Sequence, residues 1–228
     1  IANSLTGGAG NDSLYGGDGA DTLDGGADND TMAGGADNDY YLVGSVSDSV
    51  IESVGEGTDS VYATIGNYIL GGNIEYLELG TGIIAGSGNS GNETLLGNAI
   101  GNSLSGASGD DTLFGLAGND TLDGGSGVDS LVGGEGSDLY YLDSLEDEII
   151  EVSNQGTDSV LAAVNGYTLA SQVEYLELLD GVLTGTGNSL ANTLVGNSLG
   201  NSLDGGIGID RMSGGDGNDT YFVENALD

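Results

Sequence analysis

A nine-residue repeat constrains this chain more than any other feature of its sequence. The repeat runs in phase through three Gly-rich blocks, residues 7–42, 88–141 and 187–222, as fourteen units such as GGDGADTLD at residues 16–24. The first six residues of a unit are typical of a turn, because Gly adopts a positive φ at no steric cost. The last three residues indicate a short strand with a large apolar residue, Leu, Met or Tyr, in the middle.

One apolar residue per nine cannot form a hydrophobic core within a single unit. Two units, each a strand and a reversing turn, make one coil, and stacked coils place successive strands about 4.8 Å apart. The apolar residues of two facing parallel sheets then lie between those sheets. We therefore predict an all-β fold, a parallel β-roll or β-solenoid with two units, or about 18 residues, per coil. The aromatic residues that close the blocks are interpreted as core filling: Tyr40, Tyr41, Tyr140, Tyr141, Tyr221 and Phe222.

A longer repeat overlies the nine-residue one. The segment TDSVYATIGNYILGGNIEYLELGTG (58–82) returns 99 residues later as TDSVLAAVNGYTLASQVEYLELLDG (157–181). The spacers at 43–87 and 142–186 are both 45 residues long, a multiple of nine, so we expect them to continue the same winding. Their alternating stretches DSVIES, DSVYAT and IEYLEL predict strands. With blocks at 1–42, 88–141 and 187–228, we expect one continuous solenoid cut from a longer repetitive protein.

The net charge of the chain, −36, opposes folding unless cations compensate it. The chain has 37 acidic residues, one base (Arg211) and 46 glycines, a composition also typical of disordered tails. The 37% apolar share and the fixed apolar spacing count against disorder, so the counter-charge has to come from solution. Nucleic acid and anionic membranes are excluded as partners, since both require Lys and Arg. Without Cys, and without a run of apolar residues long enough to span a bilayer, we expect neither disulfides nor membrane insertion.

The sixth position of the repeat carries the chemical signal. It holds aspartate in ten units, which are Asp12, Asp21, Asp30, Asp39, Asp111, Asp120, Asp129, Asp138, Asp210 and Asp219. Units on one edge are two repeats apart, so Asp12 is expected beside Asp30 and Asp111 beside Asp129, where the carboxylates repel each other. Carboxylates together with turn carbonyls give the six to eight oxygen ligands that Ca²⁺ takes, whereas Zn²⁺ and copper favour His or Cys, which the chain lacks. We therefore predict several Ca²⁺ ions.

Backbone carbonyls of the turns are also predicted to bind Ca²⁺. They belong to Gly7, Gly8, Gly10, Gly16, Gly17, Gly19, Gly25, Gly26, Gly124, Gly125, Gly127, Gly133, Gly134, Gly136, Gly205, Gly206, Gly208, Gly214, Gly215 and Gly217.

The unit GGxGxDxUx, in which U is a large apolar residue, resembles the nonapeptide of the repeats-in-toxin (RTX) family of hemolysin-type calcium-binding proteins. Eight of the fourteen units match the turn as GG-x-(G/D)-x-D, and GASGDD and GLAGND miss only the second Gly. The resemblance implies a right-handed β-roll in which two turns on one edge hold each Ca²⁺. It also implies a chain that is disordered in the low-calcium cytosol, leaves the cell by type I secretion and folds outside.

Four units depart from the pattern at position six, with Glu93, Asn102, Asn192 and Asn201, and Asn3 falls in the same register. Asn offers one carbonyl and no charge. We expect these units to bind calcium poorly or not at all, and their amides to bond Asn to Asn along the roll.

Three further aspartates fall in the register of the roll. Asp48, Asp147 and Asp228 each lie two repeats beyond a position-six aspartate. We predict that they cap the last calcium of each block; the alternative is a solvated turn aspartate.

The sequence favours a structural role over catalysis. The chain has no His, Lys or Cys for nucleophilic chemistry, and its carboxylates are explained by the repeat, so we predict no enzyme activity in this segment. The block–spacer order resembles long arrays in surface-layer proteins, filaments and adhesins, outside the cell or at its surface. The expected partners are calcium ions, copies of the chain itself or a cell surface. The alternative is a non-catalytic calcium-binding repeat region attached to a secreted protease, lipase, polysaccharide epimerase or lyase.

Overall fold

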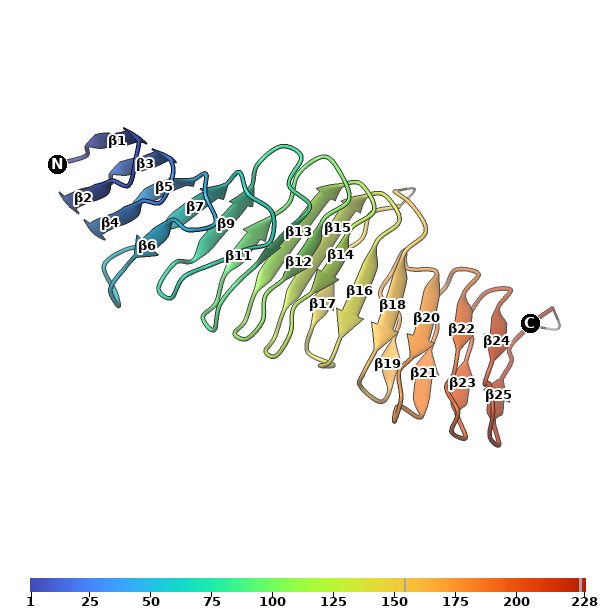
Figure 1. The fold of residues 1–228 in the computed structure, drawn as a ribbon. Coiled ribbons are helices and arrows are strands. Elements are labelled where there is room, and N and C mark those ends of the chain that lie inside the picture. Colours follow the sequence, from blue (N-terminus) through green and yellow to red (C-terminus); the bar gives the residue numbers. More distant parts are fainter. Residues whose placement is uncertain (154, 226) are drawn as a thin grey trace.

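The computed structural model describes residues 1–153, 155–225 and 227–228. Every regular element in these ranges is a β-strand, and the strands wind into an elongated β-solenoid of about twelve coils with about 18 residues each (Figure 1). The two termini lie at opposite ends of the stack. None of these residues belongs to a helix long and apolar enough to cross a membrane.

Two long parallel sheets form most of the solenoid wall. The first contains nine strands: β1 (Ser4–Ala9), β3 (Thr22–Ala27), β5 (Tyr40–Val43), β7 (Ser60–Ala63), β9 (Tyr76–Leu79), β11 (Thr94–Leu96), β13 (Thr112–Ala117), β15 (Ser130–Glu135) and β17 (Glu148–Ile149). The second contains nine more: β8 (Tyr68–Ile69), β10 (Ala85–Ser87), β12 (Ser103–Ser105), β14 (Thr121–Asp123), β16 (Leu139–Leu142), β18 (Ser159–Ala162), β20 (Tyr175–Leu178), β22 (Thr193–Val195) and β24 (Arg211–Ser213).

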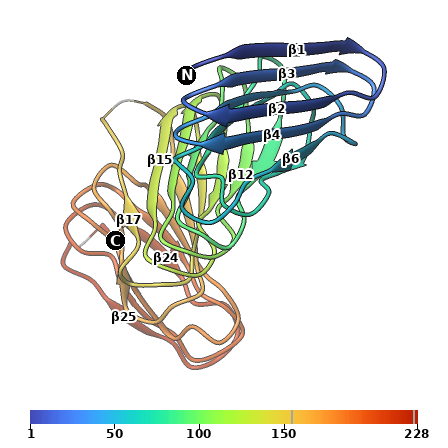
Figure 2. The ribbon, with the colours of Figure 1, turned by 90° about the vertical axis from the view of Figure 1, so that its left-hand side faces the viewer.

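Two short parallel sheets complete the coils at the ends of the stack. One contains β2 (Ser13–Asp18), β4 (Thr31–Ala36) and β6 (Ser49–Ile51). The other contains β19 (Tyr167–Thr168), β21 (Thr184–Thr186), β23 (Ser202–Asp204) and β25 (Thr220–Phe222). Viewed from the end that carries residue 1, β1 to β4 stand in front of the later coils (Figure 2).

The strand register confirms the predicted coil length. Leu5 pairs with Leu23, which lies two repeats further along the chain. In the first spacer Tyr40 pairs with Ser60 and Ser60 with Tyr76, so one coil is two residues longer than a regular coil and the next is two residues shorter. The second spacer has the same two steps. One long and one short coil together equal two regular ones, so each spacer returns the chain to the nine-residue phase.

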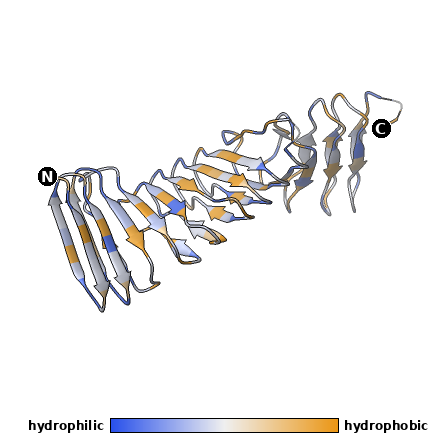
Figure 3. Ribbon diagram, turned by 90° about the horizontal axis from the view of Figure 1, so that it is seen from above, coloured by the Kyte–Doolittle hydropathy of each residue, from blue (hydrophilic) through white to orange (hydrophobic). Residues whose placement is uncertain are grey.

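The apolar residue of each repeat turns into the space between the sheets, because side chains alternate along a strand. Figure 3 shows short hydrophobic bands within the strands. Twelve of the fourteen are buried: Leu14, Leu23, Met32, Tyr41, Leu95, Leu104, Leu113, Leu122, Leu131, Tyr140, Leu194 and Leu203. In the last coils Met212 packs against this core and Tyr221 is 44% exposed.

The prediction that the aromatic residues closing the blocks fill the core is correct only in part. Tyr41 and Tyr140 are fully buried, as predicted. Tyr141 is 38% exposed and Phe222 is 52% exposed. Adjacent residues of a strand point to opposite faces, so only one aromatic residue of each pair can enter the core.

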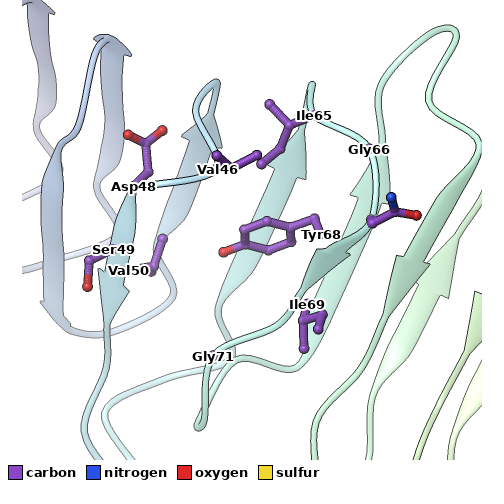
Figure 4. A pocket seen from close by; sticks show the side chains of 10 residues that line it. Val46, Asp48, Ser49, Val50, Ile65, Gly66, Tyr68, Ile69 and Gly71 are labelled. Carbon is purple, nitrogen blue, oxygen red and sulfur yellow. The ribbon is translucent and has the colours of Figure 1, made fainter.

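A cavity of about 360 Å³ lies where the short sheet ends at β6 and the second long sheet begins at β8. Val50, Ile65 and Tyr68 line it (Figure 4). Burial raises the pKa of Tyr68 to about 12. Asp48 is the one charged residue among the ten that line the cavity.

Candidate metal sites

Each Gly-rich turn delivers its position-six aspartate to the start of the following strand. One carboxylate oxygen, Oδ1, accepts a hydrogen bond from the backbone N–H of the position-six residue one coil earlier. The distance is 2.9 Å from Asp12 N to Asp30 Oδ1 and 2.8 Å from Asp111 N to Asp129 Oδ1. The fold thus stacks the aspartates along its edges in the pairs that the sequence predicts.

The second oxygen, Oδ2, is buried and has no hydrogen-bond partner in nearly all of these aspartates. This holds for Asp12, Asp21, Asp30, Asp39, Asp111, Asp120, Asp129, Asp138 and Asp210. The tenth predicted residue, Asp219, is half-buried in the last coils. A buried carboxylate oxygen without a partner costs about 1–3 kcal/mol or more, so the row of orphaned oxygens fits an edge that binds cations.

The position-one glycine of each turn lies directly beside this oxygen. A Cβ added to Gly7 would lie 2.8 Å from Asp12 Oδ2 and 2.6 Å from the carbonyl oxygen of Gly25 in the next coil. Gly106 has the same relation to the Gly124 carbonyl. A carboxylate oxygen of one coil and a carbonyl oxygen of the next coil therefore border the same space beside this glycine, and only glycine leaves room for them.

The predicted carbonyls that approach the position-one glycine of the preceding coil are those of Gly25, Gly124, Gly133, Gly205 and Gly214; the carbonyls of Gly34, Gly106 and Gly115 do the same and were not predicted. Beside the Gly205 and Gly214 carbonyls the side-chain oxygen is an Asn amide oxygen.

The electrostatics of the edge oppose ionised carboxylates in the absence of a cation. Burial raises the pKa of Asp111 to about 7, and the charges of Glu93 and Asp129 add to the shift. Burial likewise raises the pKa of Asp120 to about 6. The one basic side chain of the sequence, Arg211, is exposed on β24. Counter-charge from solution is therefore needed to keep these carboxylates ionised in the fold.

The family model for the RTX calcium-binding nonapeptide repeat (4 copies) matches residues 2–32, 15–50, 87–115, 105–140 and 186–221, together more than half of the chain. The chain belongs to this family. RTX repeats bind calcium, and their β-roll is a non-catalytic module. The orphaned oxygens fit calcium, because Ca²⁺ is a hard cation that takes oxygen ligands only from carboxylates, carbonyls and water. No curated protein matches the chain.

The three predicted capping aspartates of the RTX blocks lie in the expected register. Asp30 N–H donates to Asp48 Oδ1 at 3.0 Å, and Asp147 and Asp228 are placed in the same way. Their other oxygen differs from that of a position-six aspartate, since Asp48 Oδ2 accepts the N–H of Ser45 at 2.9 Å. This satisfied oxygen does not require a cation, and the ligand role of the three residues stays a prediction.

In the RTX units with Asn at position six, the prediction that Asn bonds Asn along the roll is wrong. Asn102 Nδ2 donates to the carbonyl of Ile83 at 2.8 Å. Asn98, at position two of the same unit, donates through Nδ2 to the carbonyls of Gly80 and Ile83 at 2.9 and 2.7 Å. Asn188 and Asn197, the equivalent residues of two later units, each donate through Nδ2 to two backbone carbonyls of the neighbouring coil. In these units an amide N–H satisfies the carbonyls of the neighbouring coil, and no metal is needed for that.

Carboxylates of the spacers continue the same ladders, although the sequence analysis did not assign them. Asp39 N–H donates to Asp59 Oδ1 at 2.8 Å, and Asp59 N–H donates to Glu75 Oε2 at 2.8 Å. The second spacer repeats both bonds. The nine-residue phase hid Asp59 because its distance from Asp39 along the chain is not a multiple of nine. The available signal was the 99-residue repeat, in which TDSV recurs with Asp59 and Asp158 in the same place.

Proposed function

We propose that this chain is a calcium-dependent extracellular structural module, which folds and stiffens on binding Ca²⁺ as part of a surface-layer, filament or adhesin protein. The observation that carries the proposal is the row of buried position-six carboxylates, each with one unpartnered oxygen. A metal-free fold would bury these charges without counter-ions in a chain of net charge −36. Calcium binding then becomes folding free energy, because the unfolded chain has no assembled site.

The proposed ligands are the ten position-six aspartates together with carbonyls of the stacked Gly-rich turns. Asp48, Asp147 and Asp228 are proposed to close the last site of each block. The continuous strand pairing from β5 through β7 and β9 to β11 supports a single solenoid in which the spacers carry the winding from one block to the next. A rod of this kind suits a load-bearing or spacing role.

A location outside the cell follows if the sites have the affinity that is usual for extracellular calcium modules. Extracellular calcium modules bind with a Kd of about 10⁻⁴–10⁻³ M, far above cytosolic calcium. At about 10 mM calcium each ion would then stabilise the fold by about 1.4–2.7 kcal/mol. Several such contributions are enough to move a chain of this charge from disorder to a folded rod when it reaches the medium.

Far-ultraviolet circular dichroism during a calcium titration tests the proposal. We expect a disordered spectrum in chelator and a strand spectrum that appears between about 0.1 and about 10 mM Ca²⁺. Mg²⁺ at the same concentrations is the control, and it should give little strand signal because it is smaller and retains its water. Small-angle scattering at saturating calcium should show an elongated particle. A full strand spectrum in chelator would overturn calcium-driven folding.

A further inference from the structure

A different kind of carboxylate cluster lies where each of the first two Gly-rich blocks joins its spacer. Oxygen atoms of Asp39, Glu52 and Asp59 all lie within 4.8 Å of one another, and these residues are 2%, 9% and 1% exposed. We call this group the first junction cluster. The second junction cluster has the same composition and consists of Asp138, Glu151 and Asp158.

The irregular coil of the spacer builds the first junction cluster. The coil from Asp39 to Asp59 is two residues longer than a regular one, and Glu52 enters from the long turn between them. Asn73 Nδ2 donates to the backbone carbonyl of Glu52 at 3.0 Å, which ties this turn to the next coil. Glu52 and Asp59 lie outside the ranges that match the RTX repeat model. The cluster therefore joins one carboxylate of the Gly-rich block, Asp39, to two carboxylates of the spacer, and it is not one more pair of stacked Gly-rich turns.

Tyr41 fixes the orientation of the glutamate in the first junction cluster. Its ring is fully buried, and its hydroxyl group donates to Glu52 Oε1 while accepting the N–H of Gly34 at 2.6 Å. A Cβ on Gly34 would collide with both the Tyr41 hydroxyl and Asp39 Oδ2. The hydroxyl, the glutamate and the aspartate thus converge on the same glycine. A tyrosine that only filled the core would not need to place its polar end there.

Two of the three carboxylates in the first junction cluster have a buried oxygen without a hydrogen-bond partner. Asp39 Oδ1 accepts the N–H of Asp21 at 2.7 Å, and Glu52 Oε1 is held by Tyr41. Asp39 Oδ2 and Glu52 Oε2 are buried and have no hydrogen-bond partner. Two unpartnered oxygens on neighbouring carboxylates point to a cation-binding site, because two negative charges within 4.8 Å of each other repel strongly when they are buried.

The second junction cluster reproduces these contacts independently. Tyr140 donates through its hydroxyl to Glu151 Oε1 and accepts the N–H of Gly133 at 2.8 Å, and Glu151 Oε2 has no partner. The 99-residue offset equals eleven repeat units, or five and a half coils, so the second cluster lies on the opposite edge of the solenoid. Tyr221 accepts the same bond from Gly214 at 2.8 Å, but it is 44% exposed and belongs to neither cluster.

We propose that each junction cluster binds one Ca²⁺ ion through its three carboxylates, with the tyrosine as a positioning residue for the glutamate. These ions would be additional to those held between stacked Gly-rich turns, and each would fasten a spacer to the block before it. The all-oxygen, trianionic donor set suits Ca²⁺, whereas Mg²⁺ favours sites in which it retains water. The inference rests on the proposed calcium-dependent function and extends it to the spacers.

The double variant Glu52→Gln/Glu151→Gln tests the proposal. Gln keeps the size of the side chain and its hydrogen bond from the tyrosine, but it removes the charge. Bound calcium per chain, measured by equilibrium dialysis with metal analysis, should fall by two ions relative to the wild type. The matched control is Glu146→Gln/Glu148→Gln, which changes the same charge at two exposed positions and should bind as many ions as the wild type.

The possible results of the dialysis measurement distinguish the junction sites from the proposed function as a whole. If the Glu52/Glu151 variant binds as many ions as its control, the junction sites are rejected while the Gly-rich sites stand. If the wild type binds no calcium, the proposed function fails together with this inference. If the variant does not give the strand spectrum in calcium, Tyr41→Phe/Tyr140→Phe replaces it.

The tyrosine variant also has an internal control. Removing the two hydroxyl groups should weaken the calcium affinity of two ions about tenfold, which is the loss expected from a hydrogen bond of about 1.4 kcal/mol to a charged ligand. Tyr221→Phe removes the same bond to a glycine N–H where neither junction cluster is present, and it should leave all affinities unchanged. Calcium isotherms of the two variants that coincide would overturn the proposal.

Discussion

Replacing Asp120 by Asn separates the role of a position-six carboxylate in cation binding from its role in packing. Asp120 is 1% exposed, its Oδ1 accepts the N–H of Asn102 at 2.6 Å, and its Oδ2 has no partner. An Asn side chain has nearly the same shape and keeps the carbonyl acceptor, but it removes the negative charge. We therefore expect the substitution to act with opposite signs at high and low calcium.

At high calcium the variant loses a charged ligand of one ion. With a Kd of about 10⁻⁴–10⁻³ M, that ion contributes about 1.4–2.7 kcal/mol at about 10 mM calcium, and the free energy of unfolding should fall by up to this amount. At low calcium the carboxylate is buried without a counter-ion. Burial raises the pKa of Asp120 to about 6, so above that pH the ionised form destabilises the fold. Removing the charge should then stabilise the fold by about 1 kcal/mol.

Urea unfolding followed by circular dichroism, at calcium concentrations from below the Kd to about 30 mM, measures both effects. Above the Kd, the loss of unfolding free energy in Asp120→Asn should shrink by about 1.4 kcal/mol for each tenfold fall in calcium. Below the Kd, where the chain is expected to be largely disordered, the variant should show more strand signal than the wild type. Asp180→Asn makes the same charge change at an exposed position and serves as the control. If Asp120→Asn lowered the unfolding free energy by the same amount at every calcium concentration, the cation-binding role would be refuted and Asp120 would be a packing residue.

Three further expectations test other parts of the structure. Because burial raises the pKa of Asp111 to about 7, the metal-free folded chain binds more protons than the unfolded chain from about pH 4 to pH 7. The chain in chelator should therefore gain strand signal as the pH falls from about 8 to about 5, and a spectrum that stays equally disordered at both pH values would contradict this. Leu116 has a φ of +80°, which costs about 1–2 kcal/mol, so Leu116→Gly should raise the unfolding free energy by about 0.5–1 kcal/mol after the entropy of Gly is deducted. Leu116→Ala keeps the strained backbone, and a gain as large as that of the Gly variant in thermal unfolding would argue against strain. Asn98→Ala removes amide hydrogen bonds to Gly80 and Ile83 and should cost about 1–3 kcal/mol at every calcium concentration; urea unfolding that shows a loss at high calcium alone would instead assign Asn98 to a metal site.

The stacked aspartates were predictable because their spacing equals the coil. A period of nine residues gives pairing partners two repeats apart, so Asp12 and Asp30 share an edge in any regular winding. The glycines of the turns also predict a positive φ, and Asp28, which stands in the place of one of these glycines, has a φ of +78°. The amide bonds of Asn98 were not predictable, because a side chain at position two has no fixed partner until the neighbouring coil is in place.

The sequence by itself determined the coil, the identity of the core residues and the row of position-six carboxylates, because each depends on a local period that stacking simply repeats. Only the tertiary structure decided which spacer carboxylates meet. Asp39, Glu52 and Asp59 are unequally spaced along the chain and follow no period, and they come together because one coil is two residues longer than the others. Contacts between coils of unequal length depend on how the whole chain closes, and no local pattern encodes them.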